Sequence, residues 1–222
     1  MRHDRLVTAR VVSVNAALPR VLEEKPRLVS AIDKIPRPGP VAVGNLGLEG
    51  DEVADPERHG GSFRAVYVYG AEDLAHWERE LGRPVRPGLF GENLTTADLD
   101  LNQCVVGEEW MVGTARFAVS TVRTPGIRFQ RWVGLQGVDA TDWAARFSSY
   151  GRPGVFLTIL GRGHVAAGDP VDVMHVPDHG VTTGTVFRAL TAEPALLPLL
   201  LEVDGLPPEV YDQAQAHADR TG

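Results

Sequence analysis

Three short segments combine charged or amide side chains with glycine, a composition typical of ligand-binding loops. The first reads GLEGDEVADPERHGGSFR and carries Asp51, His59 and Arg64. A histidine near a carboxylate can titrate close to neutral pH, as a general acid or base must. The two glycines that follow the histidine, Gly60 and Gly61, allow the backbone to approach a ligand closely. We therefore expect this segment to place proton-transfer and anion-binding groups at the rim of a pocket.

The second and third segments add amide and guanidinium groups. The second reads GLFGENL and contains Glu92 next to Asn93, whose amide both donates and accepts hydrogen bonds. The third reads VSTVRTPGIR, in which Arg123 ends an expected strand, Gly126 closes the turn and Arg128 follows it. Two arginines around a tight turn suit an anionic group, because the guanidinium fork binds carboxylates and phosphates through two hydrogen bonds.

Each segment also has an explanation without a ligand: a solvated Gly-rich loop, an asparagine in a left-handed turn, and an ordinary Pro-Gly turn. Other chemistry is easier to exclude. The single cysteine, Cys104, rules out an internal disulfide and any site made of several thiolates, and its QCVV context is typical of a buried strand. The sequence has no HExxH, CxxC or P-loop motif, so we expect no metal site made by the protein alone.

Charge and hydropathy exclude two classes of partner. The 222 residues contain 22 Lys and Arg against 29 Asp and Glu, a net charge of −7, without the basic block of a nucleic-acid binder. No apolar run approaches the roughly 18 residues of a membrane span, and the N-terminus lacks the apolar core of a signal peptide. We expect a cytoplasmic protein of undetermined oligomeric state. Lysine occurs only at Lys25 and Lys34, so nearly all the positive charge is arginine.

The pattern of elements predicts a mainly β protein. Glycine and proline are frequent, at 24 and 16 residues, which favours short strands joined by turns. Strand character recurs at 7–14, 63–69, 116–122, 155–160 and 171–176. Helical spacing of apolar residues occurs at 71–81 and 139–147. We predict a closed β-barrel with inserted helices over residues 1–178 and a small helical appendage over residues 179–222.

Taken in this order, the segments resemble the MOSC family, named after the C-terminal domain of molybdenum cofactor sulfurase. The matching motifs are GLEGDE, HGG followed by RAV, FGENL, the RTP turn and the GD pair at 168–169. The helical tail also resembles the three-helix segment that follows the domain in standalone bacterial members. The resemblance implies a closed β-barrel with a polar pocket and a link to molybdenum cofactor or sulfur metabolism.

The sequence departs from this family at one chemically important position. Standalone bacterial relatives are associated with the reduction of N-hydroxylated bases. In them the RxP turn continues into a cysteine whose thiolate is the proposed ligand of molybdenum or sulfur. This chain has Gly126 there, and glycine offers no side chain to a metal. Cys104 replaces that thiolate only if the fold brings it to the same pocket.

We interpret the sequence as a MOSC-fold enzyme that keeps an anion-binding pocket without the thiolate and acts on a small polar, N-hydroxylated or sulfur-containing molecule. In this interpretation His59, Asp51 and Glu92 transfer protons. The remaining residues bind the ligand or cofactor: Gly60, Gly61, Arg64, Asn93, Arg123, Gly126 and Arg128. Two alternatives stay open. The chain binds molybdenum cofactor through pterin and phosphate contacts, as a reductase or sulfur carrier without a protein thiolate, or it is a binding module without catalysis.

Overall fold

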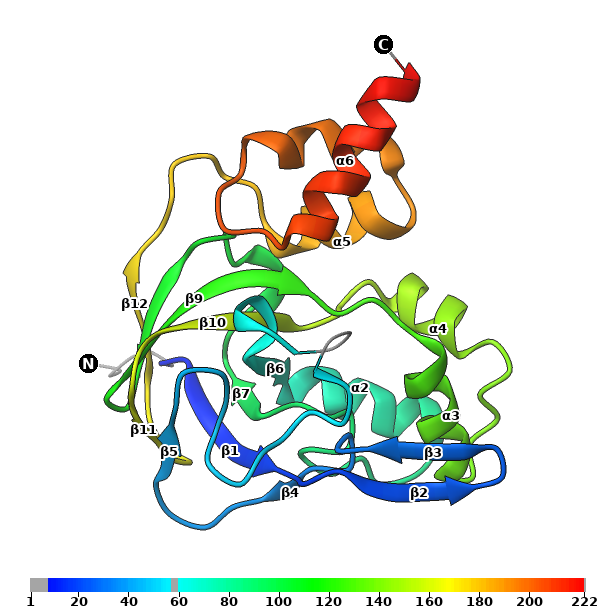
Figure 1. The fold of residues 1–222 in the computed structure, drawn as a ribbon. Helices are drawn as coiled ribbons and strands as arrows, with labels where there is room; N and C mark the ends of the chain where they lie inside the picture. Colours follow the sequence, from blue (N-terminus) through cyan, green and yellow to red (C-terminus); the bar gives the residue numbers. More distant parts are fainter. Residues whose placement is uncertain (1–7, 57–59, 222) are drawn as a thin grey trace, which may run out of the picture.

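The computed structural model describes residues 8–56 and 60–221 (Figure 1). Its centre is a mixed sheet of eight strands in which one neighbouring pair, β6 and β7, is parallel and the other pairs are antiparallel. In spatial order the strands are β12 (Val171–His175), β8 (Glu109–Val112), β9 (Ala115–Val122), β10 (Val155–Gly161), β6 (Val66–Gly70), β7 (Leu94–Ala97), β1 (Arg10–Ala16) and β4 (Ile35–Pro36). The prediction of a mainly β protein is confirmed.

The prediction of a closed β-barrel is wrong, because no sheet of the described residues closes on itself. Closure would require a continuous ladder between β1 and β12, and a single isolated bridge joins Arg10 to Pro170 there. The remaining strands form two separate pairs: β5 (Val41–Val43) with β11 (Gly163–Val165), and β2 (Arg20–Glu24) with β3 (Arg27–Ser30). Strand propensity does not contain this information, because closure depends on register and tilt across the whole sheet.

Three helices pack beside the sheet around a cluster of aromatic side chains. They are α2 (Ala71–Leu81), α3 (Ile127–Leu135) and α4 (Trp143–Tyr150). The α2 residue Trp77 lies 4.7 Å from Trp143 between ring centroids, and Phe129 of α3 meets Trp143 edge to face at 5.4 Å. The helix predicted at 71–81 is confirmed. The helix predicted at 139–147 begins at Trp143, because the Asp139 carboxylate accepts bonds from the Thr141 backbone and hydroxyl and holds a turn instead.

The C-terminal segment is helical, as expected, and forms the upper layer in Figure 1. It comprises α5 (Thr183–Thr191), the 3₁₀ helix η3 (Pro194–Glu202) and α6 (Pro208–Thr221). Apolar side chains of this segment, such as Phe187 and Val210, belong to the same buried cluster as the aromatic residues of α2, α3 and α4. Burial therefore fixes the C-terminal helices against the rest of the molecule.

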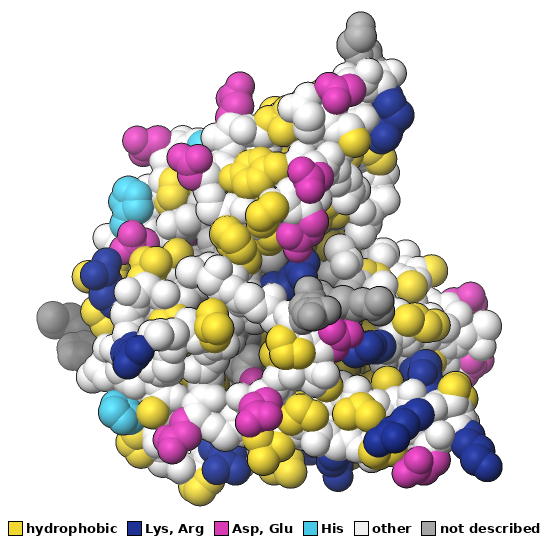
Figure 2. All heavy atoms as spheres, viewed as in Figure 1, with side chains coloured by type: hydrophobic (Ala, Val, Ile, Leu, Met, Phe, Trp, Pro, Cys, Tyr) yellow, Lys and Arg dark blue, Asp and Glu magenta, His cyan; other side chains and the backbone are white. Residues whose placement is uncertain are grey.

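A second buried cluster fills the sheet itself and contains Val66, Leu94, Phe117 and Leu157, each 1% exposed or less. Two short 3₁₀ helices lead into and out of the sheet: η1 (Ser62–Arg64) and η2 (Leu101–Gln103). Acidic and basic side chains are interspersed over the face drawn in Figure 2, without a continuous basic stripe on that face. Among the described residues, no helix is long and apolar enough to cross a membrane.

Candidate functional site

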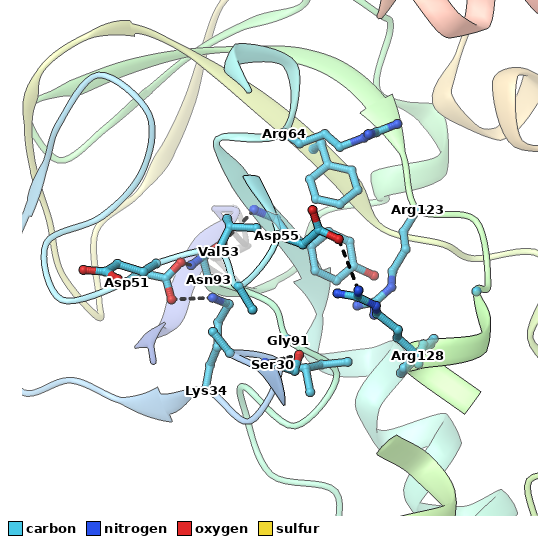
Figure 3. Close-up of a pocket in the computed structure, with 18 of the residues that line it drawn as sticks. Ser30, Lys34, Asp51, Val53, Asp55, Arg64, Gly91, Asn93, Arg123 and Arg128 are labelled. Atoms are coloured by element: carbon cyan, nitrogen blue, oxygen red, sulfur yellow. Dashed lines mark hydrogen bonds and ion pairs between the residues drawn. The ribbon is translucent and has the colours of Figure 1, made fainter. Parts of the chain in front are cut away.

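A pocket of about 450 Å³ opens where loops from distant parts of the chain meet (Figure 3). Its walls come from the loop after β3, the loop at 51–55, η1, the segment before β7, and the turn between β9 and α3. Six of the residues singled out in the sequence line it: Asp51, Arg64, Asn93, Arg123, Gly126 and Arg128. His59 lies outside the described residues. The structure therefore brings all three sequence segments to one cavity.

Cationic side chains outnumber carboxylates among the described residues that line this pocket. Four cationic side chains and three carboxylates line it among the described residues, although the chain as a whole carries a net charge of −7. The cations are Lys34, Arg64, Arg123 and Arg128. In Figure 3 the three arginines lie on one side of the pocket, and Lys34, Asp51 and Asn93 lie on the other. Aromatic side chains of Tyr67, Phe129 and Phe156 complete the walls.

The Asp51 carboxylate is the centre of a hydrogen-bonded group on one wall. It forms an ion pair with Lys34, and it accepts hydrogen bonds from the Asn93 side-chain amide at 2.8 Å and from the Ala17 backbone amide at 2.9 Å. The side chains of Lys34 and Asp51 are only 9% and 7% exposed. Burial lowers the pKa of Lys34 below its ordinary value, and the attraction of Asp51 opposes that effect. Each buried charge is therefore compensated by the other, and removal of either residue would leave its partner buried without a counter-ion.

Asn93 is held in a fixed orientation by the sheet. Its side-chain carbonyl accepts a hydrogen bond from the Tyr67 backbone amide at 3.0 Å, and its own backbone amide donates to the Tyr67 carbonyl at 2.7 Å. This pairing joins the entrances of the parallel strands β6 and β7. Because the carbonyl is used in this way, the amide nitrogen points to Asp51. The Asn93 side chain thus positions the carboxylate while the strands position Asn93.

Arg123 differs from the other pocket cations in its surroundings. Its guanidinium donates to the Phe90 carbonyl oxygen and lies over the Phe129 ring, 3.9 Å from the centroid. Tyr67 is a second aromatic neighbour at 5.1 Å. Among the described residues no carboxylate forms an ion pair with Arg123, whereas Arg128 pairs with Asp55 at 3.1 Å. Arg123 is consequently the pocket cation whose charge the described carboxylates leave least compensated.

Arg64 reaches the pocket from η1 and forms an ion pair with Glu209 of the C-terminal helix α6. Glu209 itself is not among the lining residues. A hydrogen bond holds the segment that carries Arg64 against the sheet: the Ser120 hydroxyl of β9 donates to the Phe63 carbonyl at 2.6 Å. Through the pair between Arg64 and Glu209, helix α6 contacts the wall of the pocket.

Gly126 lies at the pocket wall and is the N-cap residue of α3. A Cβ atom added there would meet no heavy atom within 4 Å, so the space beside it is open. Cys104 does not fill this role, because it is buried in the core of the sheet and is not a lining residue. Burial also raises the pKa of its thiol. No described lining residue offers a thiolate, and no cluster of three metal-binding side chains occurs in the described chain.

Glu92 does not reach the pocket and instead shapes the loop behind it. The side chain is fully buried and accepts hydrogen bonds from the Gly88 amide at 2.5 Å, the Phe90 amide at 3.2 Å and the Thr95 hydroxyl at 3.0 Å. Burial raises the pKa of its carboxyl group. Gly60 and Gly61 are likewise absent from the lining residues, and Gly61 takes φ of 96° at the start of η1. These glycines make the turn that leads to Arg64.

Sequence reasoning missed Lys34, Asp55 and Tyr67, which all line the pocket. Lys34 carried a signal, because it is one of two lysines in a chain that otherwise uses arginine. A lysine ammonium is a compact point charge on a flexible stem, and its contacts differ from those of a planar guanidinium. Asp55 belonged to the first polar segment without any distinguishing neighbour. Tyr67 resembled an ordinary strand residue in the sequence. It lines the pocket only because loops from other parts of the chain surround it in the fold.

Comparisons with known proteins give relatives of this chain in sequence and in fold. The uncharacterized protein YflK of Bacillus subtilis is 30% identical over 173 residues, 78% of this chain and 76% of its own length. The protein YiiM of Escherichia coli is 33% identical over 149 residues, 65% of this chain and 64% of its own length. The crystal structure of YiiM from Geobacillus stearothermophilus shares the fold, with a TM-score of 0.77 at 24% identity over 94% of this chain and 98% of that one.

The family model of the MOSC domain matches residues 55–172. This match covers the segments that carry Arg64, Asn93, Arg123 and Gly126, and it confirms the resemblance noted from the sequence motifs. The chain belongs to the MOSC domain family.

Proposed function

We propose that the pocket binds a small anionic molecule and that Arg123 is the cation that anchors it. The observation that carries this proposal is the guanidinium of Arg123, which lines the pocket without an ion-pair partner among the described carboxylates. Its hydrogen bond to Phe90 and its contact with the Phe129 ring orient the guanidinium before any ligand arrives. Preorganised charge of this kind loses little conformational entropy when the ligand binds.

The opposite wall supports an enzymatic role on that ligand. Lys34 and Asp51 form an acid and a base within one buried group, and both line the pocket. An anion held at Arg123 extends toward them, because the arginines and the Lys34–Asp51 pair face each other across the cavity (Figure 3). We infer that Lys34 donates a proton, or a hydrogen bond, to the polar end of the bound molecule. Burial lowers the pKa of Lys34, which favours release of a proton, and the attraction of Asp51 opposes that lowering.

The molybdenum cofactor of the family fits this pocket only in part. The arginines suit its phosphate, but the thiolate expected to hold its metal is replaced by Gly126, and the described lining residues offer oxygen and nitrogen donors alone. A soft sulfur ligand from the protein is therefore absent at this wall. We assign no step of the mechanism to that cofactor, and propose that the anionic ligand is the substrate itself, a polar N-hydroxylated or sulfur-containing molecule.

The first experiment identifies what the protein carries. The wild-type chain is purified from cells that make molybdenum cofactor and examined by native mass spectrometry and elemental analysis. We expect a small organic anion with molybdenum far below one atom per chain. Molybdenum near one per chain would instead support the cofactor without a protein thiolate.

The second experiment tests the anchor. Phenyl phosphate, an aromatic anion, serves as the probe in calorimetry at low salt. Arg123→Gln should weaken binding about tenfold or more, since a charge-assisted hydrogen bond contributes about 1.5–3 kcal/mol. Arg116→Gln is the matched control, because Arg116 lies near the start of β9, the strand that Arg123 follows, and pairs with Glu109 away from the pocket. Equal binding by all three proteins overturns the proposal. Binding without turnover of any recovered ligand would favour a non-catalytic binding module.

A further inference from the structure

The ion pair between Arg64 and Glu209 connects the pocket to the C-terminal helices. Arg64 lies in the pocket wall, and its side chain is 29% exposed. Glu209 lies in the first turn of α6, outside the pocket, and its side chain is 54% exposed. The pair joins two regions that are 145 positions apart in the sequence. Nothing in the polar motifs of the sequence points to Glu209.

Neighbouring buried residues fix the position of Glu209. The adjacent Val210 is 5% exposed and belongs to the core cluster that α6 shares with the aromatic helices. Pro208 begins α6, and the Val210 amide bonds to the Pro207 carbonyl at 2.9 Å. A carboxylate in the first turn of a helix is also stabilised by the helix dipole. These contacts fix the start of α6, where the Glu209 carboxylate pairs with Arg64.

We propose that Glu209 is a specificity-determining residue that limits the negative charge of the ligand. Its carboxylate compensates Arg64 from outside the pocket, as Asp55 compensates Arg128 from the wall. A ligand with one negative charge is then satisfied by Arg123, whereas a second negative charge meets cations that already face carboxylates. The wild-type pocket consequently favours monoanions over dianions of similar shape. This inference rests on the proposed anion site and adds a charge preference to it.

The test compares two probes of similar size and different charge. Benzenesulfonate is a monoanion, and phenyl phosphate is mainly a dianion at pH 8, because its second pKa is about 6. Binding of both is measured by calorimetry at low ionic strength, where surface charges are least screened. Glu209→Gln removes the carboxylate and keeps the side-chain shape. Asp212→Asn is the matched control, because Asp212 is an exposed acid on the same helix, away from the pocket.

We expect Glu209→Gln to strengthen phenyl phosphate binding about two- to fivefold more than benzenesulfonate binding, the range expected for an exposed ion pair. Asp212→Asn should change the ratio of the two affinities much less. In an Arg64→Gln background the effect of Glu209→Gln should largely vanish, because the partner is gone. Thermal melts of each variant check that α6 remains folded.

The outcomes separate this inference from the proposed function. If both probes bind the wild type and Glu209→Gln changes both affinities equally or not at all, the charge preference is overturned while the anion site stands. If the effect of Glu209→Gln persists without Arg64, the assigned route through Arg64 is overturned. If neither probe binds the wild type or Glu209→Gln, the anion site fails, and the inference fails with it.

Discussion

Lys34 and Asp51 form an ion pair in which both side chains are more than nine-tenths buried. Such a pair is expensive to maintain, since replacing both partners by apolar residues often leaves stability unchanged or improves it. Here the pair lies in a pocket wall, and Asp51 also accepts bonds from Asn93 and the Ala17 backbone. These contacts tie the loops after β3 and β5 together. We infer that this pair contacts a ligand, since its contribution to stability alone does not explain a buried pair at a pocket wall.

Replacing Lys34 with Met should destabilise the protein. The change leaves the buried Asp51 carboxylate with its amide donors but without its counter-ion, so we expect a loss of about 3 kcal/mol in the free energy of unfolding. Urea denaturation at pH 7 measures it. Lys25→Met is the control, because Lys25 is exposed at the turn between β2 and β3. A loss equal to that of the control would show that the pair is effectively solvated.

Lys34 should lose its proton below the ordinary lysine pKa of 10.5, because burial lowers its pKa in the folded chain. Competitive acylation across pH, with peptide mass analysis, reads this midpoint directly, since the chain has only two lysines. Between the lowered pKa and 10.5 the unfolded chain binds more protons at this residue. The contribution of Lys34 to stability therefore rises with pH across that window, relative to Lys34→Met. A labelling midpoint at or above 10.5 would contradict the expectation.

Replacing Asn93 with Asp should introduce repulsion into the same wall. The Asn93 amide donates to Asp51 at 2.8 Å, so the new carboxylate removes a donor and adds a like charge at that distance. We expect a loss of about 2–4 kcal/mol at pH 7.5, from the missing hydrogen bond and the repulsion. The loss should shrink at pH 5, because a carboxyl group introduced beside a like charge takes up a proton more readily. Asn45→Asp, at an exposed asparagine bonded to Arg162, is the control and should show neither effect.

Local patterns predicted several elements but missed others, such as α3, β7 and β8, and they did not predict whether the sheet closes or where its side chains point. The strand expected at 155–160 and the helix at 71–81 follow from short-range periodicity and are present as β10 and α2. The open sheet depends on the absence of a ladder between β1 and β12, which no local pattern encodes.

The same limit explains why the site was only partly predicted. Glu92 and Asn93 are adjacent and looked equally suited to a ligand, yet Glu92 turns inward to bond the amides of Gly88 and Phe90. A carboxylate in a Gly-rich turn can satisfy the turn or face a pocket, and the sequence alone does not distinguish these outcomes. Lys34 was missed because its partner, Asp51, is distant in the sequence and becomes a neighbour only in the fold.

Introducing a cysteine at Gly126 tests whether the open space beside it is used. Gly126 has φ of −107°, which any residue adopts, and an added Cβ meets no heavy atom within 4 Å. Gly126→Cys should therefore fold with a melting temperature close to that of the wild type. The new thiol lies at the N-terminus of α3 beside Arg128, conditions that lower a thiol pKa. A thiol reagent should modify it quickly, while the buried Cys104 stays unmodified in the folded protein.

The same variant should weaken binding of an anion anchored at Arg123, because the added side chain occupies part of the pocket that the ligand uses. We expect a larger loss of phenyl phosphate affinity in Gly126→Cys than in Gly126→Ala, since the smaller side chain leaves more of the space open. If Gly126→Cys folds, reacts with the thiol reagent and binds the probe as tightly as the wild type, the ligand does not occupy this space. The open space beside Gly126 would then have no use in ligand binding.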